Sequence, residues 1–493
     1  SGTSGITGFS NVETRIERPL LFIPGFAGSF ANTALAEDPG LDGSTVLEEW
    51  YLNRGLSPTR LVLEPLSEGY SDIVQTLVNI GYVNGTNTGL VGTLFSALWD
   101  WRVPVAETDD TADGTLSNVT AASLLDTSFD SSLDYLAYWM DQAVTAWSML
   151  TGGAPAAVDV LTHSTGGLVA RSYIQSAAYD AVASLLPIHT LIQTGVPNQG
   201  TGAPFVLLNN DFSAKSAARL LGKTLNDVWD LKQSGATILN PDGSVFEAAN
   251  EAEFVRNYVE SLHDLLASYE FLDDVQNEMQ LLRALTSSDD LSNALLADLN
   301  AYNTDAFVAR GVLDVVEDDL LEELADADAD VDSIVTFIEL LALYDTDDNN
   351  SLDVVDDALP EALSAADDGN GLGLSADGIV TYEELLRLYD RQTFIVYSEG
   401  VDTDDLVIAH TGFDSSLGLA NEVLPITEVL VGSLPESDEI WYELKNHPSG
   451  GDGTVSAFSA SAGFAAARLV EMTVLAGENI EHTGITHNEI SQR

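Results

Sequence analysis

The order of apolar and polar positions predicts a parallel β-sheet whose strands alternate with helices. A continuous apolar run at 19–23 is typical of a buried strand, and further strands are predicted at 156–161 and 186–194. Apolar residues at helical spacing predict helices over 132–149 and 166–178. Strands that alternate with helices are typical of the α/β class, so we expect a mostly parallel sheet flanked by helices.

The pattern becomes helical after residue 200, and strand patterns return near residue 390. Helices, with no obvious strand between them, are predicted at 214–231, 248–266 and 274–285. Strands are predicted again at 393–397, 406–408 and 468–475. We therefore expect a sheet that is interrupted and then resumed. The predicted units are a first part of the core at 1–200, a helical cap or lid at 201–304, an acidic insertion at 305–390 and a second part of the core at 391–493.

One serine lies where a predicted strand turns sharply into a helix. The segment Val158–Gly167 (VDVLTHSTGG) places Ser164 in that turn. Such a turn is the setting of a nucleophile elbow, in which the helix N-terminus stabilises developing negative charge. Thr162 stands where the usual motif has glycine. The alternative is a serine in an ordinary strand–helix turn.

An acid and a base follow this serine in the order that a Ser-Asp-His triad on this fold requires. Asp452 lies in a glycine-containing loop, and His482 lies just past the last predicted strand. We expect His482 to take the proton of Ser164 while Asp452 orients the imidazole. His487 is the rival base, whereas strand alternation directs His163 away from the site. The alternative is that Asp452 is a turn residue and His482 a surface residue.

The oxyanion of the reaction is expected to accept two backbone N–H groups. One is the amide of Thr165, the residue after the serine, and the other comes from the loop 24–28. We expect Phe26 to supply the second group, with Ala27 as the next candidate.

Several motifs occur in a fixed order along the chain. They are Pro24–Ser29 (PGFAGS), Gly81–Tyr82, Leu94–Phe95, Trp99–Arg102 (WDWR), His163–Arg171 (HSTGGLVAR), Gly195–Thr201 (GVPNQGT) and Asp452–Val455 (DGTV). Together they resemble the lecithin:cholesterol acyltransferase-like branch of the α/β-hydrolase lipases. This resemblance covers about residues 19–201 and 391–493, and it implies an α/β-hydrolase fold and a lipid-ester acyl hydrolase or transferase with a mobile cap. Trp99 stands where that family usually has tyrosine.

The insertion carries residues that can offer oxygen ligands at regular spacing, most of them through their side chains. The first loop has Asp328, Asp330, Asp332, Ile334, Thr336 and Glu339; the second has Asp345, Asp347, Asn349, Ser351, Asp353 and Asp356; the third has Asp368, Asn370, Asp377 and Glu384. Ca²⁺ prefers roughly six to eight oxygen ligands, which carboxylates at alternate positions can supply. The loops resemble those of EF-hand modules, so we expect structural calcium within 326–384. The alternative is an acidic, solvated surface.

An internal repeat suggests how these loops pair. Leu313–Asp318 recurs as Leu352–Asp357, and Ile334–Phe337 recurs as Ile379–Tyr382. Only five residues separate the first loop from the second, so these two share one short helix. We therefore expect the first and third loops to pair and the middle loop to lie in the linker.

Composition limits the partners of the chain. The 18 Lys+Arg residues against 78 Asp+Glu give a net charge of −60, which argues against nucleic-acid binding and against electrostatic docking on anionic lipid. The absence of cysteine excludes disulfides, a thiol nucleophile and a Cys-ligated metal. An acid-rich surface repels itself at low ionic strength, so we expect a salty habitat. The alternative is an ordinary acidic secreted protein. No apolar stretch is long enough for a transmembrane helix.

These observations predict a secreted serine lipase or carboxylesterase of the triacylglycerol lipase type. The chain begins with Ser1, as it would after removal of a signal peptide or after trimming. Its expected partners are a lipid or other acyl ester and, transiently, a lipid interface. The alternatives are a phospholipase or acyltransferase with the same triad, and a calcium-dependent binding module on a degenerate hydrolase fold. Candidates for acyl-chain contact, or else for ordinary core, are Phe205, Leu207, Leu208, Leu220 and Leu221.

Overall fold

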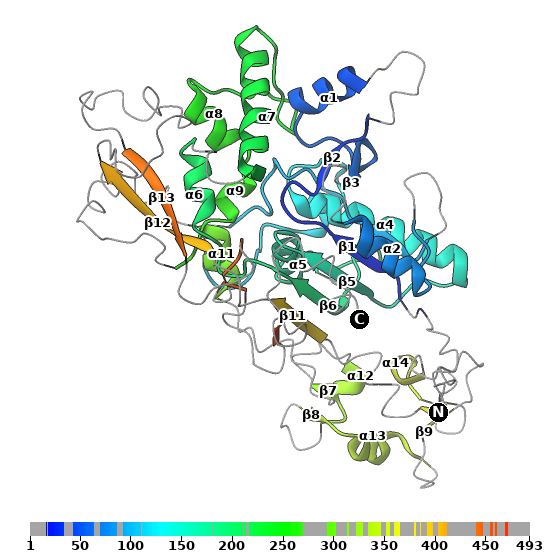
Figure 1. Cartoon of the computed structure of the whole chain (residues 1–493). Helices are drawn as coiled ribbons and strands as arrows, with labels where there is room; N and C mark the ends of the chain where they lie inside the picture. The colour runs from blue at the N-terminus through cyan, green and yellow to red at the C-terminus, as the bar shows by residue number, and fades with distance from the viewer. Residues whose placement is uncertain are drawn as a thin grey trace, which may run out of the picture.

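A computed structural model of the chain is shown in Figure 1. The residues it describes are 16, 18–33, 43–63, 70–85, 92–109, 111–179, 181–210, 212, 216–269, 293–301, 313–314, 322–328, 334–346, 352–354, 359–364, 379–380, 385, 392–397, 403–411, 440–446, 454–456, 459–460 and 469–471. None of the helices within these ranges is long and apolar enough to cross a membrane.

A six-stranded parallel sheet forms the centre of the molecule (Figure 1). From edge to edge its strands are β14 (Leu469–Glu471), β11 (Gln392–Tyr397), β6 (Ile188–Thr194), β5 (Val158–His163), β1 (Leu20–Ile23) and β4 (Leu94–Ser96). Every pairing between neighbours is parallel. β5, which leads into the candidate serine, lies between β1 and β6. The predicted α/β fold, with a sheet interrupted by the insertion and resumed by β11 and β14, is confirmed.

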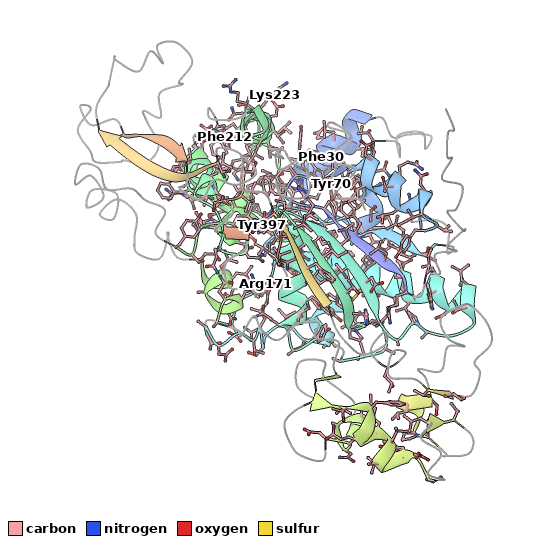
Figure 2. All side chains as sticks on the ribbon, turned by 60° about the horizontal axis from the view of Figure 1, so that its bottom comes forward. Phe30, Tyr70, Arg171, Phe212, Lys223 and Tyr397 are labelled. Carbon is pink, nitrogen blue, oxygen red and sulfur yellow. The ribbon has the colours of Figure 1, made fainter. Side chains whose placement is uncertain are left out.

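Helices cover both faces of this sheet, which explains why β1 is a continuous apolar run. Leu21 and Ile23 of β1 belong to the main hydrophobic cluster, whereas Leu20 and Phe22 belong to a smaller cluster on the other face. The main cluster includes residues of α4 (Ser132–Thr151) and α5 (Gly166–Ile174), and the smaller one includes residues of α2 (Ser71–Asn79). Figure 2 shows how densely side chains fill the space around the sheet.

The longest helix, α4, begins and ends where its local sequence requires. The amide of Ser131 donates to Oδ2 of Asp134 (2.7 Å), and Ser131 and Asp134 together form a capping box. At the other end, Gly152 adopts a left-handed φ of 85°, which terminates the helix. Burial raises the pKa of Asp134 to about 6, although the hydrogen bonds from Ser131 oppose this shift.

Short elements surround the first loop of the core. β2 (Ser29–Ala31) and β3 (Leu61–Leu63) form an antiparallel pair. The remaining elements before β5 are α1 (Gly43–Leu52), the 3₁₀-helix η2 (Pro58–Arg60) and α3 (Ala121–Leu124). α1 contributes the buried Trp50 to the main cluster, so it packs with the core.

The described residues of 201–304 are mostly helical and pack onto the core. Their helices are α6 (Ala203–Leu208), α7 (Ser216–Gln233), α8 (Glu251–Tyr258), α9 (Ser261–Asp264) and α11 (Ala294–Leu299). The helix predicted at 248–266 is two helices, because the backbone leaves the helical conformation at Val259 (φ −123°, ψ 77°). The helix predicted at 274–285 lies outside the described residues. Phe205, Leu208 and Leu221 belong to the main cluster, so these three candidates for acyl-chain contact are core residues instead.

The acidic insertion has a hydrophobic cluster of its own, separate from the main one. Its strands are β7 (Leu313–Asp314), β8 (Ile334–Val335), β9 (Leu352–Asp353) and β10 (Ile379–Val380), and its described helices are α12 (Glu322–Ala325), α13 (Phe337–Tyr344) and α14 (Glu361–Ser364). β7 pairs with β8, and β9 pairs with β10, both antiparallel. The predicted pairing of the first and third loops is therefore wrong. The first loop pairs with the strand at 313–314, and the second loop pairs with the third.

The strand predicted at 406–408 does not join the parallel sheet. It lies in β12 (Asp404–Thr411), which pairs only with β13 (Ile440–Asn446) in a separate antiparallel pair. β12 lies against α6 of the cap (Figure 1). The reason is that an adjacent antiparallel partner satisfies its backbone groups, so its apolar pattern needs no place in the main sheet.

Candidate active site

The turn after β5 holds Ser164 in a strained backbone conformation. Ser164 has a φ of 52°, a left-handed value that residues other than glycine seldom adopt. Its amide donates to the carbonyl oxygen of Thr194 on β6 (2.9 Å), and its carbonyl oxygen accepts the amide of Gly167 in α5 (3.0 Å). In the turn 163–166, Ser164 is partly exposed and its neighbours are buried. The predicted sequence of strand, sharp turn and helix is thus present.

Glycine lets two neighbouring segments approach this turn. A Cβ on Gly25 would lie 2.6 Å from Cβ of Ser164 and 3.2 Å from its Oγ. A Cβ on Gly166 would lie 2.3 Å from the carbonyl oxygen of Ile23. Side chains do not tolerate such distances, so the loop after β1 and the start of α5 can meet only if both positions are glycine.

Thr162, which replaces the usual glycine, is accommodated inside the sheet. Its side chain is buried, and its Oγ1 donates to the carbonyl oxygen of Ile192 (3.3 Å). Its carbonyl oxygen accepts the hydroxyl of Thr194 (2.6 Å). Both partners belong to β6, so this residue ties β5 to β6 directly beside the serine.

The loop after β1 forms a tight turn next to the serine. The amide of Gly28 donates to the carbonyl oxygen of Gly25 (2.9 Å), and Ala27 has a φ of 56°. Ala27 is the third residue of the turn 25–28, and a positive φ at the third residue is characteristic of a type II turn. Within the described part of the chain, the amides of Phe26, Ala27 and Thr165 have no hydrogen-bond partner, whereas those of Gly25 and Gly28 do. The amides of the two predicted oxyanion donors, Phe26 and Thr165, are therefore without a partner among the residues that the structure describes.

Two tryptophans of the WDWR segment hold this loop. Nε1 of Trp99 donates to the carbonyl oxygen of Pro24 (2.9 Å), and Nε1 of Trp101 donates to that of Ser29 (2.8 Å). Both indoles are buried, and the ring of Trp101 packs against that of Phe26 with centroids 4.9 Å apart. The departure from tyrosine at Trp99 therefore keeps a hydrogen-bond donor at this position.

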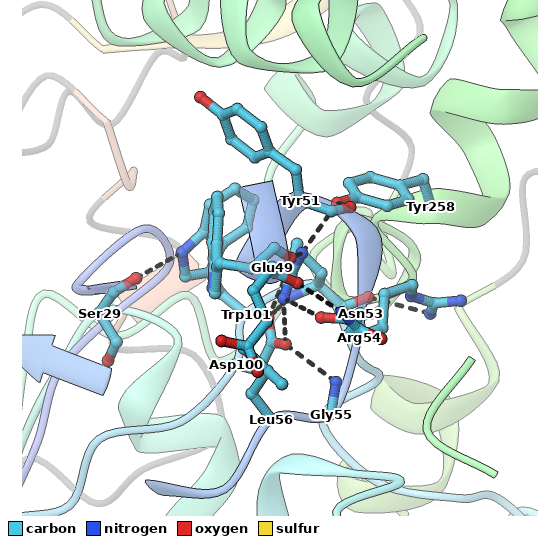
Figure 3. A network of polar contacts seen from close by, with 12 residues as sticks. Ser29, Glu49, Tyr51, Asn53, Arg54, Gly55, Leu56, Asp100, Trp101 and Tyr258 are labelled. Carbon is cyan, nitrogen blue, oxygen red and sulfur yellow. Dashed lines mark hydrogen bonds and ion pairs between the residues drawn. The ribbon is translucent and has the colours of Figure 1, made fainter. Parts of the chain in front are cut away.

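The two charged residues of the same segment form a buried ion pair (Figure 3). Nη2 of Arg102 lies 2.6 Å from Oδ2 of Asp100, and Nε lies 2.8 Å from Oδ1. The guanidinium also donates to Oη of Tyr258 (2.8 Å) and to the carbonyl oxygens of Asn53 (2.9 Å) and Trp50. Burial alone would lower the pKa of Arg102, but the electrostatic interactions and hydrogen bonds with Asp100 and Tyr258 together raise it above its ordinary value, so the side chain is cationic.

This segment also anchors part of the cap. Tyr258 ends α8, and the hydroxyl of Ser261 in α9 donates to the carbonyl oxygen of Trp101. At the end of α9, Oδ2 of Asp264 accepts the amide of Val105 (2.7 Å). Burial raises the pKa of Asp264 to about 7. The α8–α9 part of the cap is therefore fixed to the loop that holds the tryptophans.

A tyrosine that the sequence did not suggest joins the first loop to the elbow. Oη of Tyr70 accepts the amide of Gly25 (3.1 Å) and lies 2.9 Å from Nδ1 of His163. The rings of Tyr70 and His163 also pack edge to face, with centroids 5.4 Å apart. His163 is buried and bound to Tyr70, in keeping with the expected alternation of side chains along β5.

The predicted partners of Ser164 lie outside the described residues. These are Asp452, His482 and the rival base His487. β14, the strand that precedes His482, is described and pairs with β11 in the main sheet. The order of elements along the chain is thus the one a triad requires, while the positions of these three side chains stay a prediction.

The chain just after Asp452 returns to the loop that follows β6. Nδ2 of Asn198 donates to the carbonyl oxygen of Ala460 (2.9 Å). The hydroxyl of Ser459 donates to the carbonyl oxygen of Gly200 (2.6 Å). Ser164 follows β5, the neighbour of β6, so residues 459–460 are held at the same carboxyl-terminal edge of the sheet.

Few of the predicted calcium ligands fall on described residues. The structure describes Asp328, Glu339, Asp345 and Thr336, and the backbone of Ile334 and Asp353; the other ten lie outside it. Oε2 of Glu339 accepts the amide (2.8 Å) and the hydroxyl (2.7 Å) of Thr336, as the capping box of α13. Across the described ranges, no group of three or more His, Cys, Asp or Glu side chains gathers at one point. Calcium binding therefore stays a prediction.

Two residues that sequence reasoning missed connect distant segments. Tyr70 lies 93 positions from His163, and Tyr258 lies 156 positions from Arg102. Both are buried aromatic residues, and nothing in their local sequence distinguishes them from ordinary core. The WDWR motif did mark Arg102 and Asp100, but nothing in the sequence marked Tyr258, which also bonds to Arg102.

Comparison with known proteins gives only distant likenesses. No protein family and no curated protein sequence matches the chain. A chain of the Tle4–Tli4 complex is similar over 96% of this chain and 96% of its own length, with 13% identity and a TM-score of 0.34. Phospholipase PlaB from Legionella pneumophila is similar over 51% of this chain and 36% of its own, with 16% identity and a TM-score of 0.20. These likenesses are weak, so the fold assignment rests on the sheet topology.

Proposed function

We propose that the chain is a serine hydrolase that cleaves carboxylic esters of lipids through an acyl-enzyme on Ser164. The observation that carries this proposal is the left-handed φ of 52° at Ser164, in a turn where its neighbours are buried. Such strain costs on the order of 1–3 kcal/mol and clusters at active sites. The unpaired amides of Thr165 and Phe26 supply the second element that acyl transfer needs.

In the proposed reaction, His482 removes the proton of Ser164 as Oγ attacks the ester carbonyl carbon. The amides of Thr165 and Phe26 donate to the resulting oxyanion, and each donor contributes about 3 kcal/mol. The intermediate collapses as His482 returns the proton to the leaving alcohol, which leaves the acyl group on Ser164. Water, deprotonated by His482, then releases the acid. Asp452 keeps the imidazole in the required tautomer.

A lipid ester is the proposed substrate because the motifs around the site resemble those of lipases that act on lipids. The same acyl-enzyme can also serve a phospholipase or an acyltransferase, which differ in the leaving group or in the acyl acceptor. Product analysis with triglyceride, phospholipid and an added alcohol distinguishes them. Free acid alone supports the lipase, whereas a new ester of the added alcohol supports the acyltransferase.

The test of the proposed function is substitution of the serine. Ser164→Ala should lower hydrolysis of p-nitrophenyl esters by more than about 1,000-fold, and a fluorophosphonate should label the unmodified protein but not the variant. Ser148→Ala removes a hydroxyl whose hydrogen bond, to the carbonyl oxygen of Val144, lies within α4, and it should leave both hydrolysis and labelling unchanged. His482→Ala should resemble Ser164→Ala, and His487→Ala should not. Hydrolysis that persists in Ser164→Ala contradicts the proposal and leaves a calcium-dependent binding module as the alternative.

We also propose that the insertion binds Ca²⁺ in a structural role. The ligand spacing of the loops supports this, and so do the strand pairs, in which Leu313 pairs with Val335 and Leu352 with Val380. Such pairing holds neighbouring loops side by side around one hydrophobic cluster. Bound calcium would supply the charge that balances carboxylates lying close together.

Glu339→Gln tests this second proposal without removing the helix cap, because the amide oxygen of glutamine can still accept from Thr336. Ca²⁺ binding, followed by calorimetry, should weaken by at least about tenfold. Asp326→Asn, at an exposed position before the first loop, should bind calcium like the unmodified protein. If the unmodified protein binds no calcium, the insertion is an acidic, solvated surface.

A further inference from the structure

We propose that Tyr70 is a positioning residue for the reaction at Ser164. This inference rests on the proposed function. The Tyr70 hydroxyl joins the two backbone segments that must meet at the site, namely the loop 24–28 and the end of β5. Through these contacts it sets the position of the oxyanion donors relative to the nucleophile, although the residue itself touches neither substrate nor Ser164.

The contacts on each side of the hydroxyl are short and buried. Oη of Tyr70 accepts the amide of Gly25 at 3.1 Å, and Gly25 is the residue whose Cβ position lies 2.6 Å from Cβ of Ser164. On the other side, Oη lies 2.9 Å from Nδ1 of His163, the residue directly before the serine. A single oxygen atom thus bridges the neighbours of both functional elements.

The roles of donor and acceptor in this bridge follow from the chemistry of the groups. A backbone amide can only donate, so the oxygen of Tyr70 is the acceptor for Gly25. On the other side, Oη of Tyr70 and Nδ1 of His163 are hydrogen-bond partners, and the tautomer of the imidazole sets which of the two donates. Phenylalanine at position 70 could fill the same space but could make neither bond.

The bridge also determines which amides face the substrate. The amide of Gly25 is engaged by Tyr70, and its carbonyl oxygen accepts from Gly28 (2.9 Å). With both polar groups of Gly25 fixed, the amides of Phe26 and Ala27 are left as the unpaired donors of the turn within the described residues. The loop is held from its other side by Trp99. Loss of the Tyr70 bond would release the side that lies nearest to Ser164.

The ring of Tyr70 is fixed by packing that does not need the hydroxyl. It packs against the ring of Phe22 with centroids 5.4 Å apart, and a Cβ on Gly28 would lie 3.1 Å from its Cε2. Tyr70→Phe should therefore keep the fold and the ring position while it removes the bridge. Because the packing of the ring does not depend on the hydroxyl, removal of this one oxygen atom tests the proposal.

Tyr70→Phe should lower kcat for p-nitrophenyl ester hydrolysis by about 10- to 100-fold, because a small misplacement of the donors weakens binding of the transition state. KM should change by less than about threefold, because the oxyanion donors act mainly in the transition state. Tyr173→Phe is the matched control. It also removes a buried tyrosine hydroxyl, one that donates to the carbonyl oxygen of Leu186 (2.9 Å), and it should keep the kcat of the unmodified protein.

Substitution of His163 provides a rescue experiment. The side-chain amide of asparagine can take the place of Nδ1 as a hydrogen-bond partner of Tyr70, whereas leucine offers none. His163→Asn should therefore retain more activity than His163→Leu, by about tenfold. Hydrogen exchange gives a measurement that does not depend on activity: in Tyr70→Phe the hydrogen-bonded amides of Gly25 and Gly28 should exchange at least about tenfold faster, while those of α5 stay unchanged.

The outcomes separate this proposal from the proposed function. If the unmodified protein neither hydrolyses esters nor reacts with a fluorophosphonate, the proposed function fails, and the role of Tyr70 fails with it. If the unmodified protein is active and Tyr70→Phe keeps its kcat, only the positioning role is overturned. Equal losses in Tyr70→Phe and Tyr173→Phe would also overturn it, because the effect would then be general destabilisation.

Discussion

Replacement of Asp100 by asparagine tests how strongly the core depends on one buried charge. Oδ1 of Asp100 accepts from the amide (3.1 Å) and Nε (2.8 Å) of Arg102, and Oδ2 accepts from Nη2 of Arg102 (2.6 Å) and the amide of Gly55 (3.0 Å). Asparagine has a single oxygen, so its NH₂ group must face two of these donors. The guanidinium would also be left as a buried charge without its carboxylate.

Breaking a buried pair in this way costs about 3–5 kcal/mol. That is a large part of the roughly 5–15 kcal/mol that stabilises a typical native protein. Urea denaturation at constant salt, followed by tryptophan fluorescence, measures this loss in the free energy of unfolding. The slope of that free energy against urea concentration should not change. The pair Glu49–Arg60 is a matched control, because its N–O distance is also 2.6 Å but its side chains are 33% and 32% exposed. Glu49→Gln should cost less than about 1 kcal/mol. Equal losses in the two variants would refute the argument that burial determines the cost.

Three further predictions concern the loop, the cap and the surface. Gly25→Ala should lower ester hydrolysis by more than about 100-fold because its Cβ would lie 2.6 Å from that of Ser164, whereas Gly153→Ala, with no atom within 4 Å, should have no effect. The pKa of Asp264 is raised from 3.8 to about 7 in the folded protein, so its ionisation destabilises the fold as pH rises through that interval. Asp264→Asn keeps the acceptor for Val105 and should therefore raise Tm at about pH 8 but not near pH 4, and an equal change at both values would contradict the assignment. Desalting should lower Tm because the net charge of −60 repels itself when it is not screened, and a Tm that is indifferent to salt would argue against this.

The elements of the core could be predicted because their signals are local. β1 is a short apolar run, β5 and β6 are short segments rich in apolar residues, and α4 has both its cap residues and its helical spacing in the sequence. The elbow was predictable for the same reason. Strand, serine, glycines and helix follow one another within ten residues, so the backbone at Ser164 has few alternatives.

The contacts that hold the site could not be predicted from local patterns. Tyr70 and His163 meet only because α2 packs on one face of the sheet, beside β5, and Tyr258 reaches Arg102 only because α8 packs on the core. Tyr70 and Tyr258 are both buried tyrosines in an apolar setting. A sequence pattern distinguishes such a residue from core only after the packing of the elements is known.

The predicted pairing of the first and third loops was wrong because it assumed that each copy of the repeat contains one loop. Leu313 and Leu352 are equivalent positions, and so are Ile334 and Ile379. In the first copy the strand at 313–314 pairs with the strand at 334–335, and in the second copy the strand at 352–353 pairs with the strand at 379–380. The repeating unit is therefore a pair of strands. The strand at 313–314 was not predicted to pair with a calcium loop because no loop with calcium-ligand spacing precedes it.

The geometry of the site depends on a balance between strain and a few hydrogen bonds. Ala27 and Ser164 both have left-handed φ values, which together cost on the order of 2–6 kcal/mol. The bonds that hold the loop come from Trp99, Trp101 and Tyr70, and each contributes about 0.5–1.5 kcal/mol net. The two sums are of similar size, so the loss of one bond is enough to let the loop relax, while the sheet and its hydrophobic clusters remain folded. A substitution that removes one of these hydrogen bonds but keeps the buried ring, such as Tyr70→Phe, should therefore reduce activity well before it reduces the stability of the protein.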